Sequence, residues 1–118
     1  MDPLRRQVTD SSLDALIRCI EILRVMDVEM PAQTVAVFLY IASHDGCHSQ
    51  AVQEDLDLTS ASISRNATWL SGKHRSNPLR GLDLITKESD PTNRRRNVFT
   101  LTREGKQLAK QLSDILNG

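Results

Sequence analysis

The 118-residue sequence is poor in the residue types that several protein classes require: it has two cysteines, four aromatic residues, five glycines and four prolines. Cys19 and Cys47 are too few for the disulfide framework of a small secreted domain. No stretch approaches the roughly 18 apolar residues of a membrane span, and the opening MDPLRRQVTD lacks the apolar segment of a secretory signal. We therefore expect a cytoplasmic protein that has no membrane partner.

Catalytic and cofactor motifs are missing as well. The sequence contains no glycine-rich phosphate loop, no Ser/His/Asp order with supporting glycines and no paired carboxylates in an apolar setting. The stretch HDGCH at residues 44–48 offers three possible metal ligands, but no second cluster completes a tetrahedral site. We expect no enzyme activity, no cofactor and no bound metal, and the scarcity of aromatic residues leaves open whether a small-molecule effector exists.

The formal net charge is zero, with 15 basic and 15 acidic residues, but the charges are divided along the chain. Residues 1–64 hold 4 basic and 10 acidic side chains, a net charge of −6, whereas residues 65–110 hold 11 basic and 4 acidic side chains, a net charge of +7. A concentrated basic half is what the binding of a polyanion requires, so a nucleic-acid partner is compatible with a neutral total.

The first half of the chain has the spacing of helices. Apolar residues recur every three or four positions over residues 10–28, which predicts an amphipathic helix capped by Asp10, Ser11 or Ser12. Cys19 falls within this apolar pattern, so we expect a packed thiol and not a reactive one. A second helix is predicted from Pro31 to Ser43, with Val35, Phe38, Leu39 and Ile41 turned inward and Gly46 as a left-handed terminator.

Two short helices follow, separated by a tight link. The first is predicted over residues 49–56 with Ser49 as its cap, and the second over residues 60–71 with Thr59 or Ser60 as its cap. This pairing is typical of a helix-turn-helix, whose second helix enters the major groove of DNA.

The helix over residues 60–71 has two unlike faces. Ile63, Ala67 and Leu70 fall on one side, and the opposite side carries Ala61, Ser62, Arg65, Thr68 and Trp69. Short hydrogen-bonding side chains let a helix approach DNA closely, and arginine can read guanine with two hydrogen bonds. An ordinary solvated helix face would have the same composition, so this feature alone does not decide the function.

The last third of the chain reads as a hairpin followed by a helix. Residues 73–81 form a basic loop, residues 84–88 and 97–101 have the β-branched and aromatic content of strands, and residues 89–96 (SDPTNRRR) are predicted to form the turn between them. Thr102 is placed to cap a final helix over residues 102–116. This order of elements predicts a mainly helical α+β fold with a two-stranded wing, a winged helix-turn-helix in one domain over residues 1–118.

The stretch DPTNRRRNVFTLTREG at residues 90–105 resembles the wing signature of the MarR family of bacterial regulators, D-P-x-D-R-R followed by L-T-x-x-G. The segment AVQEDLDLTSASISRNATWL is similar to the helix-turn-helix of the same family. The resemblance covers roughly residues 30–110. It implies a homodimeric transcriptional regulator that binds double-stranded DNA.

Carried over by position, Ser64 and Arg65 match a T-R pair on the family's recognition helix, and Arg95 matches the arginine that enters the minor groove. A narrow minor groove suits a guanidinium because it concentrates negative potential. The family usually braces this arginine with an aspartate, but this chain has Asn93. Arg94 and Arg96 are expected to add phosphate contacts.

The chain departs from the family again after Leu70. Ten residues, SGKHRSNPLR, separate Leu70 from Gly81, where the family usually has about four. Lys73 and Arg75 in this insertion either add phosphate contacts or belong to a solvated loop, and the sequence leaves both readings open.

We therefore expect a repressor that binds a pseudo-palindromic site as a homodimer, with residues 31–101 as the DNA-binding core and residues 10–28 and 102–116 as dimerisation helices. The alternative is a winged helix used as a protein-interaction module in a transcription or replication complex. The residues expected to contact DNA are Ser60, Ser62, Ser64, Arg65, Thr68, Lys73, Arg75, Arg94, Arg95 and Arg96.

Overall fold

The computed structural model describes residues 6–72 and 81–118, apart from the side chains of residues 94 and 95. In chain order, these residues form α1 (Ser11–Met26), α2 (Ala32–Ser43), β1 (Cys47–His48), α3 (Ser49–Leu56), α4 (Ser60–Leu70), β2 (Ile85–Asp90), β3 (Asn93–Leu101) and α5 (Arg103–Asn117). The expected mainly helical α+β class with a β wing is confirmed. Among the helices of the described residues, none has both the length and the apolar character of a membrane span.

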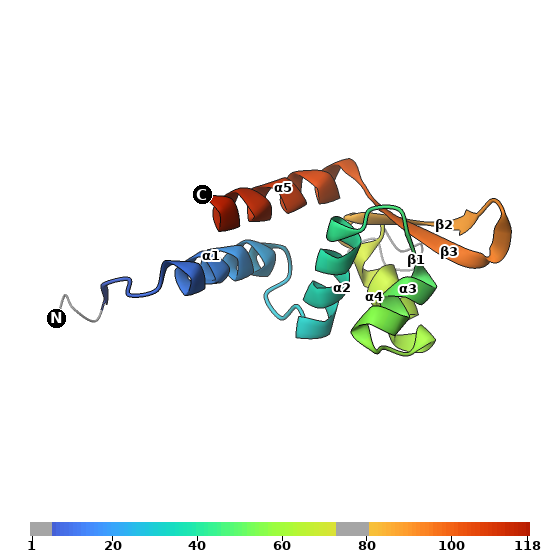
Figure 1. The fold of residues 1–118 in the computed structure, drawn as a ribbon, viewed down its shortest axis with the longest axis horizontal. Coiled ribbons are helices and arrows are strands. Elements are labelled where there is room, and N and C mark those ends of the chain that lie inside the picture. Colours follow the sequence, from blue (N-terminus) through green and yellow to red (C-terminus); the bar gives the residue numbers. More distant parts are fainter. Residues whose placement is uncertain (1–5, 73–80) are drawn as a thin grey trace.

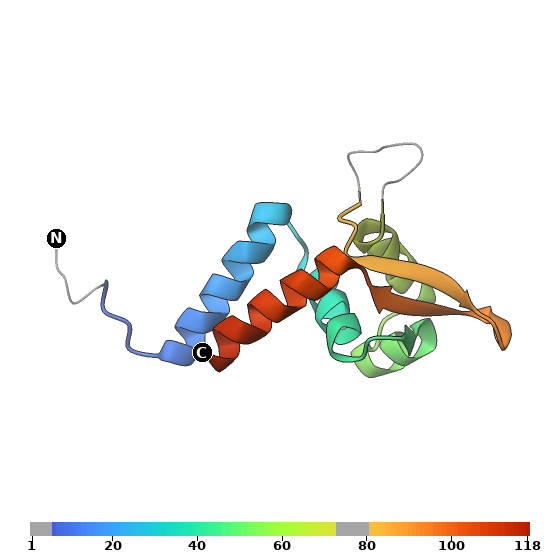
Figure 2. The same ribbon diagram turned by 90° about the horizontal axis from the view of Figure 1, so that it is seen from above.

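The molecule is elongated, with α1 and α5 at one end and the β2–β3 hairpin at the other (Figures 1 and 2). Helices α2, α3 and α4 lie between these two ends (Figure 1). A single cluster of buried apolar side chains runs from α1 and α5 through these helices to the sheet. The two ends therefore share one continuous core.

Helices α1 and α5 pack against each other through small and medium-sized side chains. Ala15, Cys19 and Leu23 are the buried residues of α1, and the Cys19 thiol lies 3.7 Å from the carbonyl oxygen of Leu112 on α5. The expected burial of Cys19 is thus confirmed. Asp10 caps α1 by accepting hydrogen bonds from the backbone N–H groups of Ser12 and Leu13.

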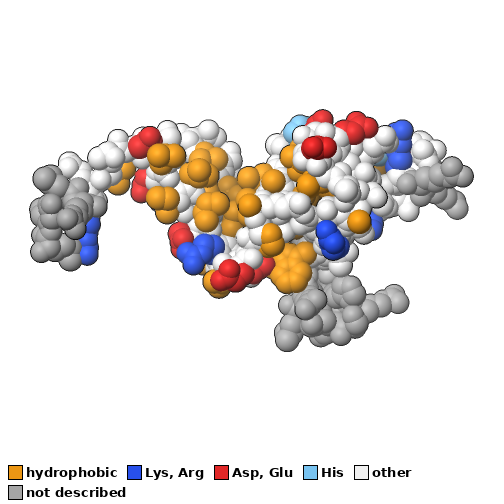
Figure 3. All heavy atoms as spheres, turned by 90° about the horizontal axis from the view of Figure 1, so that it is seen from below, with side chains coloured by type: hydrophobic (Ala, Val, Ile, Leu, Met, Phe, Trp, Pro, Cys, Tyr) orange, Lys and Arg blue, Asp and Glu red, His pale blue; other side chains and the backbone are white. Residues whose placement is uncertain are grey.

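Most of the apolar stripe of α1 does not face the core. Leu13, Leu16 and Ile17 are 60%, 50% and 59% exposed. Hydrophobic side chains gather over this helix on the face seen in Figure 3. The chain on its own buries only one side of α1 and leaves an unusually apolar surface in water.

The helix boundaries follow the sequence closely, with small shifts. The predicted cap Thr59 is confirmed, because its hydroxyl accepts the N–H of Ser62 at 3.1 Å. His48, and not Ser49, occupies the N-cap position of α3. Within α2, Leu39 was expected to be buried but is 45% exposed, and Val37 is buried in the core instead.

The wing contains one more strand than the sequence predicts. Strand β1 pairs antiparallel with β3, with Cys47 opposite Phe99 and His48 opposite Val98, which gives the order β1-β3-β2. The sequence predicts strands only over residues 84–88 and 97–101. Two residues are too few to show a periodic pattern. The pairing of this strand is set by a partner about 50 positions away in the sequence.

The turn of the wing is shorter than predicted. Strand β3 begins at Asn93, so the three arginines lie on a strand and not in the turn, which is limited to Pro91 and Thr92. Asp90 closes this turn, since one of its oxygens accepts both the backbone N–H and the hydroxyl of Thr92, at 2.9 and 2.8 Å. Side-chain capping of this kind is a common use of aspartate in tight turns.

Gly105 in the first turn of α5 is buried against the start of the wing. A Cβ atom added at Gly105 would lie 2.0 Å from the carbonyl oxygen of Leu84. The same oxygen accepts the backbone N–H of Thr102 at 3.0 Å. The glycine of the L-T-x-x-G pattern is therefore required because helix and strand backbones touch at this point.

We expect Gly105→Ala to lower the free energy of unfolding by about 1–3 kcal/mol, as overpacking does, although glycine to alanine in a helix interior ordinarily raises it by about 0.5–1 kcal/mol. Urea denaturation followed by circular dichroism measures the change. Lys106→Ala, on the exposed side of the same turn, is the control and should shift the midpoint little. A stabilised Gly105→Ala variant would contradict the close contact.

Candidate nucleic-acid interface

Helix α4 presents a polar face to solvent. Ser60, Ser64, Arg65 and Thr68 are exposed, and Ser62 is half-buried. Ile63, Ala67 and Leu70 are buried on the other side, as predicted. The structure therefore places all five α4 residues expected to contact DNA on one helix, with only Ser62 partly covered.

Hydrogen bonds within α4 restrict these side chains. The guanidinium of Arg65 donates to the hydroxyl of Ser62 at 3.2 Å, and the hydroxyl of Thr59 donates to the same oxygen at 3.1 Å. The hydroxyl of Thr68 donates to the carbonyl of Ser64 at 2.9 Å. The bond to Ser62 uses one of the five N–H donors of the Arg65 guanidinium, so this side chain can still bind an external acceptor.

Asn66 holds the inner side of α4 and was not predicted from the sequence. It is 6% exposed, and its carbonyl oxygen accepts the hydroxyl of Thr34 on α2 at 2.7 Å. Its amide donates to the side chain of Gln33 and to the backbone carbonyl of Ser62, each at 2.8 Å. The signal was a polar residue three positions after Ile63, on the stripe that otherwise holds apolar residues.

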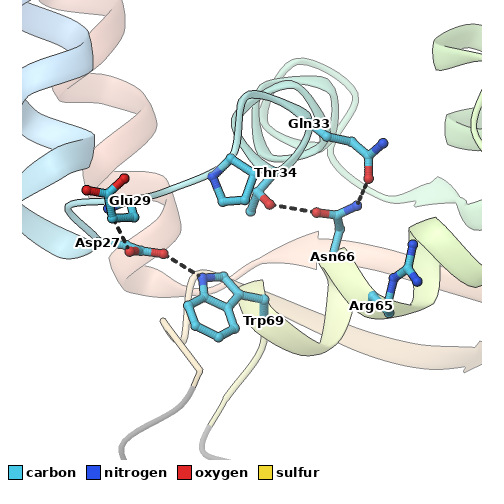
Figure 4. A pocket seen from close by; sticks show the side chains of 8 residues that line it. Asp27, Glu29, Gln33, Thr34, Arg65, Asn66 and Trp69 are labelled. Carbon is cyan, nitrogen blue, oxygen red and sulfur yellow. Dashed lines mark hydrogen bonds between the residues drawn. The ribbon is translucent and has the colours of Figure 1, made fainter.

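Trp69 links α4 to the connection between α1 and α2. Its indole N–H donates to a carboxylate oxygen of Asp27 at 3.0 Å, and the other oxygen of Asp27 accepts the backbone N–H of Glu29 at 3.2 Å (Figure 4). Asp27 is also the residue at which α1 ends. One side chain therefore connects the end of α1 to α4.

The structure describes only some of the remaining residues that were expected to contact DNA. Arg94, Arg95 and Arg96 are consecutive on β3, and the side chain of Arg96 is exposed. The side chains of Arg94 and Arg95, and the whole of Lys73 and Arg75, lie outside the described residues. Their predicted contacts stay predictions.

The space between α4 and the wing is a cleft of about 420 Å³ with a mixed polar and apolar lining. The residues that line it come from α3, α4, β2 and β3: Ser49, Gln53, Ser60, Ala61, Ile63, Ser64, Lys87, Asn97 and Phe99. Lys87, Gln53 and Asn97 were not among the sequence candidates. In the alternation of β2, Lys87 shares the face of the buried Ile85 and pairs with Phe99, so its signal in the sequence was its place in the basic half of the chain.

An Asp-His pair connects the wing to the start of α3. His48 Nε2 lies 2.8 Å from the carboxylate oxygen of Asp90 that does not contact Thr92. Hydrogen bonds from the backbone and hydroxyl of Thr92, and then from His48, lower the pKa of Asp90 to about 2. His44, the other histidine of HDGCH, stacks on Tyr40 with ring centroids 4.2 Å apart. The two histidines thus make separate structural contacts.

Solved structures of MarR-family regulators share this fold. Superposition on the structure of MarR gives a TM-score of 0.58 with 20% identity, over 89% of this chain and 75% of that one. The MepR–DNA complex of S. aureus gives 0.67 with 18% identity, over 98% and 84%. PcaV from Streptomyces coelicolor, in complex with its natural ligand, gives 0.58 with 20% identity, over 86% and 70%.

No protein-family model matches the chain, and no curated protein shows significant sequence similarity to it. The likeness to the solved structures therefore concerns the fold. The chain has the winged-helix fold of MarR-family transcriptional regulators.

We expect Thr34→Val to lower the free energy of unfolding by about 1–3 kcal/mol, because it leaves the buried carbonyl oxygen of Asn66 without the Thr34 donor. Chemical denaturation measures this loss. Thr68→Val removes an exposed hydroxyl of the same kind and should change stability by no more than about 0.5 kcal/mol. Equal effects of the two substitutions would show that the Asn66 network does not stabilise the fold.

We expect Asp90→Asn to remove part of the acid dependence of stability. Since the pKa of Asp90 is lowered from 3.8 to about 2, its contribution is fully present above pH 3.8 and is lost as the pH falls through about 2. Unfolding midpoints between pH 7 and pH 2 should differ at neutral pH and converge in acid. Asp114→Asn, at an exposed carboxylate paired with Lys110, is the control. Parallel curves for wild type and Asp90→Asn would refute the assignment.

Proposed function

We propose that this protein is a non-enzymatic transcriptional regulator that binds double-stranded DNA in a sequence-specific way and represses transcription by occupying a promoter. The observation that carries the proposal is the polar, arginine-bearing outer face of α4, which lies beside a basic wing in a winged-helix fold. In this fold the second helix of the helix-turn-helix is the element that reads base edges in the major groove.

The charge distribution supports the same partner. The basic half of the sequence begins at Arg65 and supplies the wing, while the acidic half supplies α1 to α3. Lys87 in the cleft and Arg96 on β3 place positive charge on the described part of the wing. Phosphate contacts from such residues orient a protein on DNA, and base contacts from α4 then supply specificity.

A homodimer is the second part of the proposal. Six large apolar side chains of α1 are exposed, and Leu116 at the end of α5 is exposed as well; clustered exposed apolar residues of this kind mark interaction surfaces. A second copy would cover this apolar surface through a twofold interface. Two α4 helices would then face successive major grooves, so the site would be pseudo-palindromic with half-sites about one DNA turn apart.

The alternative is a winged helix that docks another protein in a transcription or replication complex. Such a surface would need exposed apolar residues on α3, α4 or the wing. Within the described residues, the large exposed hydrophobic side chains lie instead on and around α1, on α2 and at the end of α5: Val8, Leu13, Leu16, Ile17, Ile20, Val25, Met26, Val28, Leu39 and Leu116. This distribution favours a nucleic acid at the α4 face.

Selection from random duplex DNA at about 150 mM salt, where non-specific phosphate binding is weakened, tests the proposal directly. We expect enrichment of a pseudo-palindrome with half-sites about 10 base pairs apart. Enrichment of a single half-site would support sequence-specific DNA recognition and contradict the homodimer. Recovery of no motif would favour the protein-docking alternative.

The selected duplex then tests the wing. Arg95→Ala should weaken binding by about 1–3 kcal/mol if the side chain enters the minor groove, with an unchanged unfolding midpoint. Fluorescence anisotropy measures the affinity. Arg18→Ala is the matched control, since Arg18 is an exposed arginine of α1 that pairs with Asp14. Unchanged affinity of Arg95→Ala would place this arginine outside the binding site.

A further inference from the structure

We propose that His48 is a positioning residue for the wing, because its hydrogen bond to Asp90 holds the arginine-bearing stretch of β3 in a fixed place relative to the helix-turn-helix. In the DNA-free protein this bond keeps residues 93–97 from opening. In the complex with DNA it raises the affinity, and this second effect rests on the proposed function.

Residues 94–96, the three arginines, leave the regular ladder of the wing. Asn97 pairs with Ser89 and Asn93 pairs with Asp90, so β3 has three residues between these pairs where β2 has none. An insertion of this kind is a bulge, which interrupts the ladder hydrogen bonds of the strand. Figure 2 shows the far end of the hairpin extending beyond the helices. The conformation of this stretch therefore depends on contacts other than the β2–β3 ladder.

The bond between His48 and Asp90 crosses this stretch. Strand β3 is the middle strand of the sheet, with β1 on one side and β2 on the other. His48 in β1 lies opposite Val98, and Asp90 at the end of β2 lies opposite Asn93. The 2.8 Å contact between His48 Nε2 and the Asp90 carboxylate thus joins the two outer strands across the part of β3 that carries the arginines.

His48 also ties this end of the wing to the helix-turn-helix. It is the N-cap residue of α3, and α3 and α4 share the buried core through Val52 and Ile63. The two hydrogen bonds that Thr92 donates to Asp90 stay within the turn, so they close the turn without orienting it. The bond from His48 comes from outside the hairpin and fixes the turn relative to α3. Two elements that contact adjacent grooves of DNA need a fixed distance between them.

The bond is strong because its acceptor is ionised. The pKa of Asp90 is lowered to about 2, first by the bonds from Thr92 and then by the bond from His48, so the carboxylate is charged at neutral pH. An ionised carboxylate has no proton to donate, so Nε2 of His48 carries the hydrogen. Hydrogen bonds to charged acceptors are roughly twice as strong as those between neutral groups.

Two substitutions of His48 isolate this bond. His48→Leu removes the donor, whereas His48→Gln keeps one, because the glutamine amide nitrogen is as many bonds from Cβ as Nε2 of histidine. Neither change removes a helix cap, since the His48 side chain makes no capping hydrogen bond to α3. His44→Leu is the matched control, at a histidine that contacts Tyr40 and Ser43 instead. Circular dichroism verifies the fold of each variant.

Trypsin, which cleaves after arginine, reports on this stretch in the DNA-free protein. Brief digestion followed by mass spectrometry gives the rate of cleavage after residues 94, 95 and 96. We expect His48→Leu to raise this rate about tenfold, because cleavage follows the population of the opened stretch and one hydrogen bond to a charged group is lost. His48→Gln should restore most of the protection, and His44→Leu should match wild type. Cleavage after Arg24 in α1 should not change, which separates local opening from a general loss of stability.

The duplex obtained by selection tests the effect on DNA binding. His48→Leu should weaken binding about tenfold in fluorescence anisotropy, because the arginine-bearing stretch must then be ordered during binding. His48→Gln should recover most of the affinity, and His44→Leu should bind as wild type does. Recovery by glutamine identifies the hydrogen bond, and not the imidazole ring, as the cause.

Equal cleavage of wild type and His48→Leu after residues 94–96 would overturn the proposal, as would equal cleavage of His48→Gln and His48→Leu. Faster cleavage of His48→Leu with unchanged DNA affinity would overturn the role in positioning. The cleavage assay contains no DNA. A failed selection for an operator would therefore count against the proposed function and leave the cleavage result in force, and a failed cleavage test would leave the DNA-binding proposal unaffected.

Discussion

The structure depends on how the buried side of α4 is fixed to the core while its polar side stays exposed to solvent. Apolar residues such as Ile63 and Ala67 give this helix its place in the core, but apolar contacts alone allow a helix to rotate or slide at little cost. The buried hydrogen bonds of Asn66 to α2 add direction, because an unpaired amide in the core costs free energy. The Trp69–Asp27 bond adds a second fixed point near the end of the helix.

This arrangement also explains which features the sequence could predict. Thr59 and Thr102 are caps, and a cap is decided by residues within one helical turn, so both were found correctly. Strand β1 and Asn66 depend on partners more than 30 positions away, which local spacing cannot reveal. The order of the elements was predictable because the spacing of apolar residues in each segment indicates whether it is a helix or a strand. The contacts that orient α4 were not predictable.

The wing shows the same division between local and distant causes. The dipeptide at residues 90–91 correctly indicated a turn, yet its length was overestimated because arginines and Asn93 have no strong strand preference of their own. Asn93 pairs with Asp90 and Asn97 pairs with Ser89, so the three arginines lie in the irregular stretch of β3 between these two pairs, next to the turn that Asp90 closes. The basic half of the chain, by contrast, could be found from the sequence in spite of the neutral total charge, because charges are counted residue by residue.

The contact between Gly105 and Leu84 joins the first turn of α5 to the chain just before β2, with no side chain between the two backbones. The hydrogen bond from the Thr102 N–H to the Leu84 carbonyl lies beside this contact and joins the same two segments. Any side chain larger than hydrogen at residue 105 would push α5 away from the base of the wing. The angle between the helix at one end of the molecule and the hairpin at the other is therefore set by a residue that has no side chain.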